Sequence, residues 1–145
     1  MTCVSHSEEE TQKIGKEISK KLERGDVVGL YGELGSGKTV LAKGIASGLK
    51  SKVQVKSPSF TIINEYSGKY TIYHIDLYRI EEADDLLKLG FDDYFYGNGV
   101  CVIEWAEKIR DYLPPKGFDV HITVLDETTR EIKVLPRNKH AYVRN

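Results

Sequence analysis

The sequence predicts a three-layer α/β domain whose sheet mixes parallel and antiparallel strands. A short apolar run at Val27–Tyr31, typical of a buried strand, leads into a glycine-rich loop and then an amphipathic helix. The second half of the chain is dense in Ile, Thr and Tyr and contains two hairpin signals. A strand–loop–helix start followed by hairpins favours a mixed sheet, and 145 residues suit one domain, expected to span 1–145.

The first predicted helix follows a short N-terminal segment. Residues 7–10 form an S-x-x-E capping box, and Ile14, Ile18 and Leu22 recur at a spacing of four up to about Glu23. The pair Gly25-Asp26 ends this helix before the strand Val27–Tyr31. A second helix is predicted from Gly37 to about Leu49.

The remaining elements alternate between strands and short helices. Strands are predicted at 60–66 and 70–78 around a turn at 67–69, a helix at 81–89, a strand at 100–104, a helix at 106–112, and a final hairpin of 118–125 and 130–135 around 126–128. Pro114-Pro115 closes the last helix.

Composition excludes several classes of protein. The net charge of −1 gives no global attraction to nucleic acid or to an anionic membrane. No apolar run approaches the roughly 20 residues that span a bilayer, and the N-terminus has no signal-peptide pattern. The two cysteines, Cys3 and Cys101, have no metal or redox spacing, and Cys101 is expected in the core. We therefore expect a cytoplasmic protein.

The loop Gly32–Thr39, GELGSGKT, matches G-x-x-x-x-G-K-[ST] at every fixed position. Such a loop turns successive N–H groups inward as an anion nest, and the helix that follows adds the positive end of its dipole. Lys38 offers a cation to the β and γ phosphates, and Thr39 offers a hydroxyl to Mg²⁺. We expect the nucleotide to contact Glu33, Leu34, Gly35, Ser36, Gly37, Lys38 and Thr39, although the Glu33 side chain could equally be a solvated loop acid. The fold predicted is therefore P-loop NTPase-like.

A P-loop also needs a carboxylate for Mg²⁺ and a group that orients the attacking water. Asp76, near the end of a strand, shares a face with His74, and an acid in an apolar strand is costly unless it is paired or binds a cation. Pairing with Arg79 is the structural alternative to a metal role. Glu104, at the end of the strand Val100–Glu104, could polarise a water or could simply cap the next helix.

Together these segments resemble the TsaE family, small bacterial ATPases of tRNA threonylcarbamoyladenosine biosynthesis. The resemblance runs through nearly the whole chain and lies in these segments: Glu8-Glu9-Glu10-Thr11, the GELGSGKT loop, Val55–Thr61 (VKSPSFT), His74–Arg79 (HIDLYR) and Ile103–Ala106 (IEWA). Two positions differ from the commonest family pattern, with Glu33 in place of Asp and Ser59 in place of Thr. Both keep the functional group.

The resemblance implies ATP and Mg²⁺ as cofactors and a role for each site residue. Its implied catalytic residues are Glu104, Lys38 and Thr61, its metal ligands are Thr39, Asp76 and Glu104, and Thr11 and Trp105 lie near the nucleotide. By residue type alone, Trp105 would be a core residue. The resemblance also implies TsaD and TsaB as partner proteins. Contact with tRNA would then occur only indirectly, through that complex, and neither DNA nor a membrane would be a partner.

Three other functions remain alternatives at this stage. A small-molecule kinase needs an acceptor pocket and usually a basic lid, and no Arg-rich lid segment is present. A GTPase commonly carries N-K-x-D, but Asn138-Lys139 is followed by His140 and Ala141, which favours ATP. A nucleotide-gated binding module with negligible hydrolysis is the third.

Overall fold

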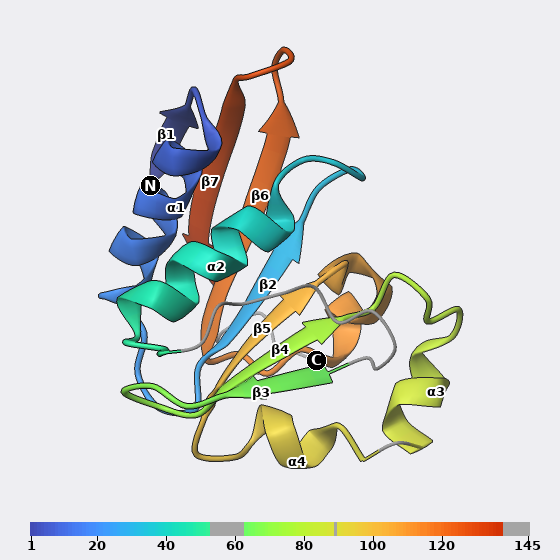
Figure 1. Cartoon of the computed structure of the whole chain (residues 1–145). Coiled ribbons are helices and arrows are strands. Elements are labelled where there is room, and N and C mark those ends of the chain that lie inside the picture. The colour runs from blue at the N-terminus through green and yellow to red at the C-terminus, as the bar shows by residue number, and fades with distance from the viewer. Residues whose placement is uncertain (53–62, 89, 138–145) are drawn as a thin grey trace.

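A computed structural model of the chain describes residues 1–52, 63–88 and 90–137, and within them one sheet of seven strands forms in the order β1-β7-β6-β2-β5-β4-β3 (Figure 1). The strands are β1 Thr2–Ser5, β2 Val27–Tyr31, β3 Ile63–Tyr66, β4 Ile72–Asp76, β5 Val100–Glu104, β6 Gly117–Val124 and β7 Arg130–Pro136. The helices are α1 Glu8–Ser19, α2 Lys38–Gly48, α3 Ala83–Lys88, α4 Asp92–Phe95 and the 3₁₀ helix η1 Ala106–Tyr112.

The sheet is parallel in the middle and antiparallel at its edges. Strands β6, β2, β5 and β4 run parallel to one another, whereas β7, β1 and β3 pair antiparallel. Every residue of β2 and β5 is buried, as expected for strands covered on both faces. The mixed sheet predicted from the sequence is confirmed.

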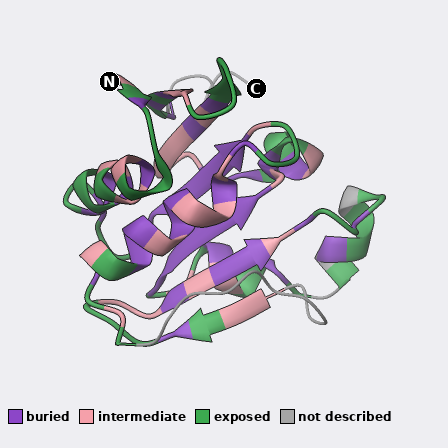
Figure 2. Ribbon diagram, turned by 45° about the horizontal axis from the view of Figure 1, so that its top comes forward, coloured by how far each residue is buried: buried purple, intermediate pink, exposed green. Residues whose placement is uncertain are grey.

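Helices cover both faces of this sheet, which confirms the three-layer arrangement. On one face α1 and α2 lie side by side (Figure 1), and Ile18 and Leu41 pack with strand residues such as Val28. On the other face, Phe95 of α4 and Ile109 of η1 pack in a second buried cluster. Because side chains alternate along a strand, β2, β4 and β5 each contribute to both clusters, and Figure 2 shows this buried interior along the middle of the sheet.

The two helices of the first face approach each other closely. A Cβ atom at Gly15 of α1 would lie 2.6 Å from the carbonyl oxygen of Leu41, and one at Gly44 of α2 would meet the backbone of Gln12. Only glycine permits such an approach of two helix backbones. This packing brings the N-terminus of α1 beside the N-terminus of α2, where the phosphate loop ends.

Several boundaries differ from the sequence prediction. Helix α1 ends at Ser19 and not near Glu23, because Lys21 and Leu22 donate to carbonyls three residues back in a tightened last turn. The capping box is half formed: Ser7 Oγ accepts from the N–H of Glu10, but the Glu10 carboxylate accepts from the His6 N–H instead of from Ser7.

The strand predicted at 70–78 is shorter, and two elements were not predicted. Strand β4 covers Ile72–Asp76, so Tyr78 lies beyond it and is exposed. Strand β1 and the single turn α4 are each four residues long, too short to show a period. Residues 60–62 of the other predicted strand and residue 89 lie outside the described residues.

In the described ranges, every helix is too short or too polar to cross a membrane.

Candidate nucleotide-binding site

The phosphate loop joins the end of β2 to the start of α2, as its sequence motif requires. Gly35 and Gly37 have φ values of +80° and +106°, and apart from the adjacent residues no heavy atom lies within 4 Å of a Cβ built on either. The two glycines are therefore required by the backbone conformation and not by crowding. The left-handed turn at Gly37 directs the chain into α2 and leaves the first N–H groups of the helix for an anion.

Lys38 is buried and spans the loop. Its Nζ donates to the carbonyl oxygens of Gly32 at 2.6 Å and of Glu33 at 3.0 Å, and it lies 3.8 Å from the centre of the Trp105 ring. Burial lowers the pKa of the Lys38 ammonium below its usual value, because desolvation disfavours the charged form. The loop thus holds a partly desolvated cation whose charge an anionic group would satisfy.

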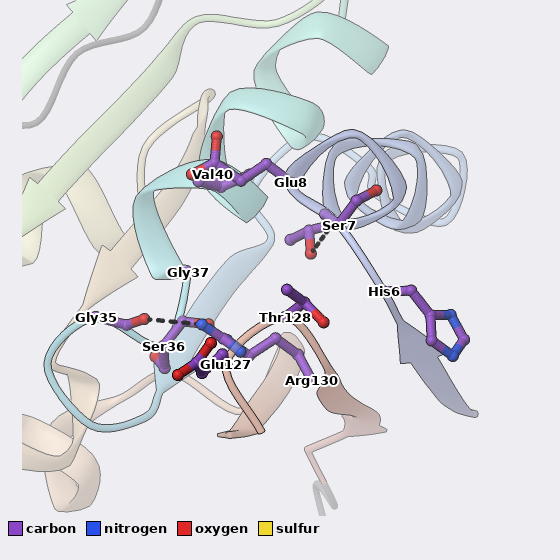
Figure 3. Close-up of a pocket in the computed structure, with 11 residues that line it drawn as sticks. His6, Ser7, Glu8, Gly35, Ser36, Gly37, Val40, Glu127, Thr128 and Arg130 are labelled. Carbon is purple, nitrogen blue, oxygen red and sulfur yellow. Dashed lines mark hydrogen bonds between the residues drawn. The ribbon is translucent and has the colours of Figure 1, made fainter. Parts of the chain in front are cut away.

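A second cation, Arg130, braces the loop from outside. Its Nε donates to the carbonyl oxygen of Ser36 at 3.1 Å, and an Nη lies 3.5 Å from the carbonyl oxygen of Gly35. Figure 3 shows this side chain reaching from the β6–β7 hairpin to the loop. In an anion nest the N–H groups face inward and the carbonyls outward, so a donor that holds the carbonyls stabilises the nest.

Two carboxylates meet opposite the loop because of strand register. Strands β4 and β5 are parallel neighbours, and Asp76 is directly paired with Glu104 at the C-terminal ends of these two strands. Residues paired in this way place their side chains on the same face of the sheet. His74, two positions before Asp76, lies on that face as well.

Glu104 is buried and is held by two donors. Thr39, in the first turn of α2, donates its hydroxyl to the two carboxylate oxygens at 2.9 and 3.1 Å. His74 Nε2 lies 2.5 Å from Glu104 Oε2. Glu104 is 3% exposed, and the N-cap residue of η1 is Trp105 with no side-chain capping hydrogen bond, so Glu104 does not cap that helix.

Asp76 differs from Glu104 in its surroundings. Burial raises the pKa of the Asp76 carboxyl above its usual value, while the hydrogen bond that Oδ1 accepts from the Tyr78 N–H acts in the opposite direction. The charge of Glu104 adds to the rise, and that of Arg79 opposes it. A cation placed between the two carboxylates would relieve both the desolvation and the repulsion.

The donor set fits Mg²⁺, which prefers oxygen ligands. Thr39, Asp76 and Glu104 offer one hydroxyl and two carboxylates on the same pocket. No group of three or more His, Cys, Asp and Glu side chains within the described ranges could hold a metal by itself. Such a site matches the usual Mg²⁺ arrangement of one or two carboxylates completed by phosphate oxygens.

Two pockets flank the N-terminus of α2. The first, of about 340 Å³, is lined by the loop residues Leu34, Gly35, Gly37, Lys38 and Thr39 together with Glu8, Val40, Asp76, Tyr78, Glu104 and Trp105. The second, of about 270 Å³, lies between α1, the loop and the hairpin tip (Figure 3). Its lining includes Thr11, Ser36, Thr128 and Arg130. The phosphate loop thus separates a pocket rich in carboxylates from one built by α1 and the hairpin.

Comparison with known proteins identifies the family. The family model described as threonylcarbamoyl adenosine biosynthesis protein TsaE matches residues 5–132. The chain is 41% identical over 134 residues to the Treponema pallidum "tRNA threonylcarbamoyladenosine biosynthesis protein TsaE", covering 92% of this chain and 99% of the relative. It is 44% identical over 125 residues to the Bacillus subtilis protein of the same name, covering 86% and 78%. The chain belongs to the TsaE family.

A solved structure agrees with this assignment. The crystal structure of Bacillus subtilis YdiB superposes with a TM-score of 0.78 at 35% identity, covering 99% of this chain and 89% of that one. The TsaE resemblance and the α/β fold predicted from the sequence are therefore both confirmed. The TsaE family acts in threonylcarbamoyladenosine biosynthesis of tRNA.

The structure brings together most of the residues that the TsaE resemblance pointed to. Lys38, Thr39, Asp76, Glu104 and Trp105 line one pocket. Trp105 is half-buried with a φ of +60°, in a left-handed turn that follows β5. It lines the pocket and also packs against the second buried cluster, so the core placement expected from its type is met in part.

The other predicted site residues lie on the second pocket, on the surface or outside the described ranges. Thr11 is buried on the second pocket, and its hydroxyl bonds to the carbonyl of Ser7. The Glu33 side chain is exposed, and its backbone carbonyl accepts from Lys38. Thr61 and the rest of the VKSPSFT segment lie outside the described residues.

Sequence reasoning missed one residue and undervalued another. Arg130 has no local signal, because its role depends on the hairpin folding back over the loop 94 residues earlier. His74 was predicted only to share a face with Asp76, and its hydrogen-bond partner could not be named from the sequence. The parallel pairing of β4 with β5 decides that its partner is Glu104.

Proposed function

We propose that this chain binds ATP and hydrolyses it in a Mg²⁺-dependent reaction that supports the TsaD–TsaB proteins in tRNA threonylcarbamoyladenosine modification. The observation that carries the proposal is the convergence of the P-loop residues Lys38 and Thr39 with the carboxylates Asp76 and Glu104 on one pocket. A phosphate cradle alone would imply only binding. Paired acids opposite it supply what hydrolysis needs.

The phosphates would lie over the loop. Its inward N–H groups, the positive end of the α2 dipole and the Lys38 ammonium would hold the β and γ phosphate oxygens. Arg130 would keep the loop in the conformation that presents those N–H groups. The adenosine would occupy the pocket beside Thr11, since that pocket opens on the other side of Gly35–Gly37.

The carboxylate side of the pocket would carry the chemistry. Mg²⁺ held by Thr39, Asp76 and Glu104 would neutralise charge that develops on the phosphates. A hydroxyl has two lone pairs besides its proton, so Thr39 can bind a cation and still donate to Glu104. Glu104 would accept a hydrogen bond from the attacking water and orient it toward the γ phosphate.

Hydrolysis is proposed to be slow in the isolated chain and faster with partners. Lys38 is the one cation among the described residues that line the carboxylate pocket. Phosphoryl transfer enzymes often receive an additional arginine from a partner protein, which raises turnover by about 10³–10⁵. TsaD and TsaB are the partners that the family resemblance implies.

Turnover with and without magnesium tests the nucleotide chemistry. The wild-type chain should bind ATP in calorimetry and hydrolyse it only with Mg²⁺, and Asp76→Ala should lose about 100-fold or more of that turnover while still binding nucleotide. Magnesium-dependent turnover that is unchanged in Asp76→Ala would remove Asp76 from the site.

Co-purification tests the partner role. The full chain should associate with TsaD and TsaB in an ATP-dependent manner, and its hydrolysis should rise in their presence. Failure to associate with or without ATP would exclude the partner role and leave an ATPase alone. Fast turnover by the isolated chain would contradict the need for partners.

A further inference from the structure

His74 and Glu104 form a buried polar pair under α2. The exposed fractions are 1% for His74 and 3% for Glu104, and their side chains are 2.5 Å apart. Burying a carboxylate is costly unless donors satisfy it, so this contact lowers the cost of keeping Glu104 inside the sheet face.

The two donors to Glu104 differ in what they fix. Thr39 contacts both carboxylate oxygens, at 2.9 and 3.1 Å, and this allows the carboxylate to rotate without losing its donor. His74 contacts Oε2, and it comes from a central strand paired in register with β5. The imidazole therefore selects one orientation of the carboxylate and leaves Oε1 directed at Thr39 and the nucleotide pocket.

The other nitrogen of His74 has no hydrogen-bond partner among the described residues. Its Nδ1 atom is buried, and no described residue forms a hydrogen bond with it. A neutral ring with its proton on Nε2 donates to Glu104 and leaves only an acceptor unsatisfied, whereas the other tautomer would bury an unpaired N–H and place a lone pair against the carboxylate. The histidine therefore leaves one buried atom unsatisfied, and in return it supplies a directed donor to Glu104 Oε2.

We infer that His74 is a positioning residue for the proposed hydrolysis: it holds Glu104 by one oxygen so that the other stays oriented toward the attacking water. The inference rests on the role proposed for Glu104. His74 itself lies behind the carboxylate, so it contacts neither nucleotide nor water in this role.

The first test compares His74→Phe with His74→Gln in single-turnover hydrolysis of ATP by the full chain. Loss of an outer partner of this kind typically costs about 10–100-fold, and we expect that loss in His74→Phe. His74→Gln, whose amide can still donate to Glu104, should recover most of it. The Kd for ADP should change by no more than about twofold in both, because His74 does not hold the phosphates.

A double variant separates positioning from a structural role. His74→Phe should have little further effect in a Glu104→Gln background, since the group that it positions is already lost. Losses that multiply would overturn the inference. If Glu104→Gln alone hydrolyses ATP normally, the proposed function of Glu104 fails; if it is slow but His74→Phe is normal, only the positioning role fails.

Two further variants keep the test decisive. His74→Asn serves in place of His74→Phe if the phenylalanine variant does not fold. The asparagine side chain is small, polar and too short to reach Glu104, so His74→Asn should show the same loss of hydrolysis. His121→Phe is the matched control, because His121 lies on β6 and stacks on Tyr31, which belongs to the buried cluster on the opposite face. It should hydrolyse ATP at the wild-type rate.

Discussion

The phosphate loop and the carboxylate pair face the same pocket but are assembled in different ways. The loop is eight consecutive residues, and its conformation comes from two left-handed glycines and the helix that follows, so the anion site proposed for it is made of local backbone. The carboxylate pair comes from two strands, and 28 positions separate Asp76 from Glu104. Only the register of β4 against β5 brings the two acids together.

This difference separates binding from hydrolysis. A site made of local backbone can hold phosphates whether or not the rest of the pocket is intact. The acids depend on the sheet and on the hydrogen bonds of Thr39 and His74 to Glu104. Changes in the loop should therefore impair nucleotide affinity, and changes in the acids should impair turnover at unchanged affinity.

The largest effect is expected for Lys38→Ala. Charge-assisted hydrogen bonds contribute about 1.5–3 kcal/mol, so the Kd for ATP should rise about 10- to 100-fold. Turnover should fall by a further factor of about 100 or more, because the ammonium also stabilises charge in the transition state. Calorimetry and steady-state hydrolysis measure the two losses separately.

Lys43→Ala is the control for this loss. Lys43 lies on the same helix but lines neither pocket in the described structure, so its removal should change little. Equal losses in both variants would mean that the general charge of α2 and not the loop cation binds phosphate.

The same difference explains what the sequence could predict. Val27–Tyr31 and Val100–Glu104 were located to the residue, because short apolar runs bounded by polar residues or Gly have few alternatives. The loop between β2 and α2 was predicted for the same local reason, from its G-x-x-x-x-G-K-[ST] motif. The pairing of His74 with Glu104 and the reach of Arg130 to the loop depend on the sheet order, which no local pattern contains. Short elements such as β1 exist through pairing with β7 and not through propensity.

Arg130→Ala tests whether the loop is as independent as its local sequence implies. Loss of the hydrogen bonds to the carbonyls of Ser36 and Gly35 should loosen the nest and raise the Kd for ATP about three- to tenfold, equivalent to roughly 1 kcal/mol. Arg130→Lys keeps the charge but not the planar fork, and we expect it to recover only part of the affinity.

The lysine variant also decides how Arg130 acts. Full recovery in Arg130→Lys would show that charge near the nucleotide matters and that the loop needs no brace. An unchanged Kd in both variants would show that the loop is self-supporting.

The smallest expected effect is on the thermal stability of the folded chain, measured without nucleotide or Mg²⁺, and it comes from the acid pair Asp76 and Glu104. Burial raises the pKa of Asp76 in the folded chain above its usual value of 3.8. The folded state therefore binds a proton more tightly than the unfolded state, and the cost of ionising Asp76 is absent below pH 3.8 and grows as the pH rises through the raised pKa. Asp76→Asn removes this cost, so it should raise the melting temperature at pH 7 by a few degrees at most, since the group is partly exposed and screened.

Asp126→Asn is the control of opposite sign. Backbone N–H donation from Thr128 lowers the pKa of Asp126, so this carboxylate stabilises the fold above pH 3.8, and its contribution is lost as the pH falls through the lowered pKa. Melting curves between pH 3.5 and 7 should show the gain of Asp76→Asn shrinking toward low pH, while Asp126→Asn loses stability at pH 7. A gain in Asp76→Asn that does not depend on pH would mean that the acid is not strained by its burial, and that strand pairing alone brings it to the pocket at no electrostatic cost.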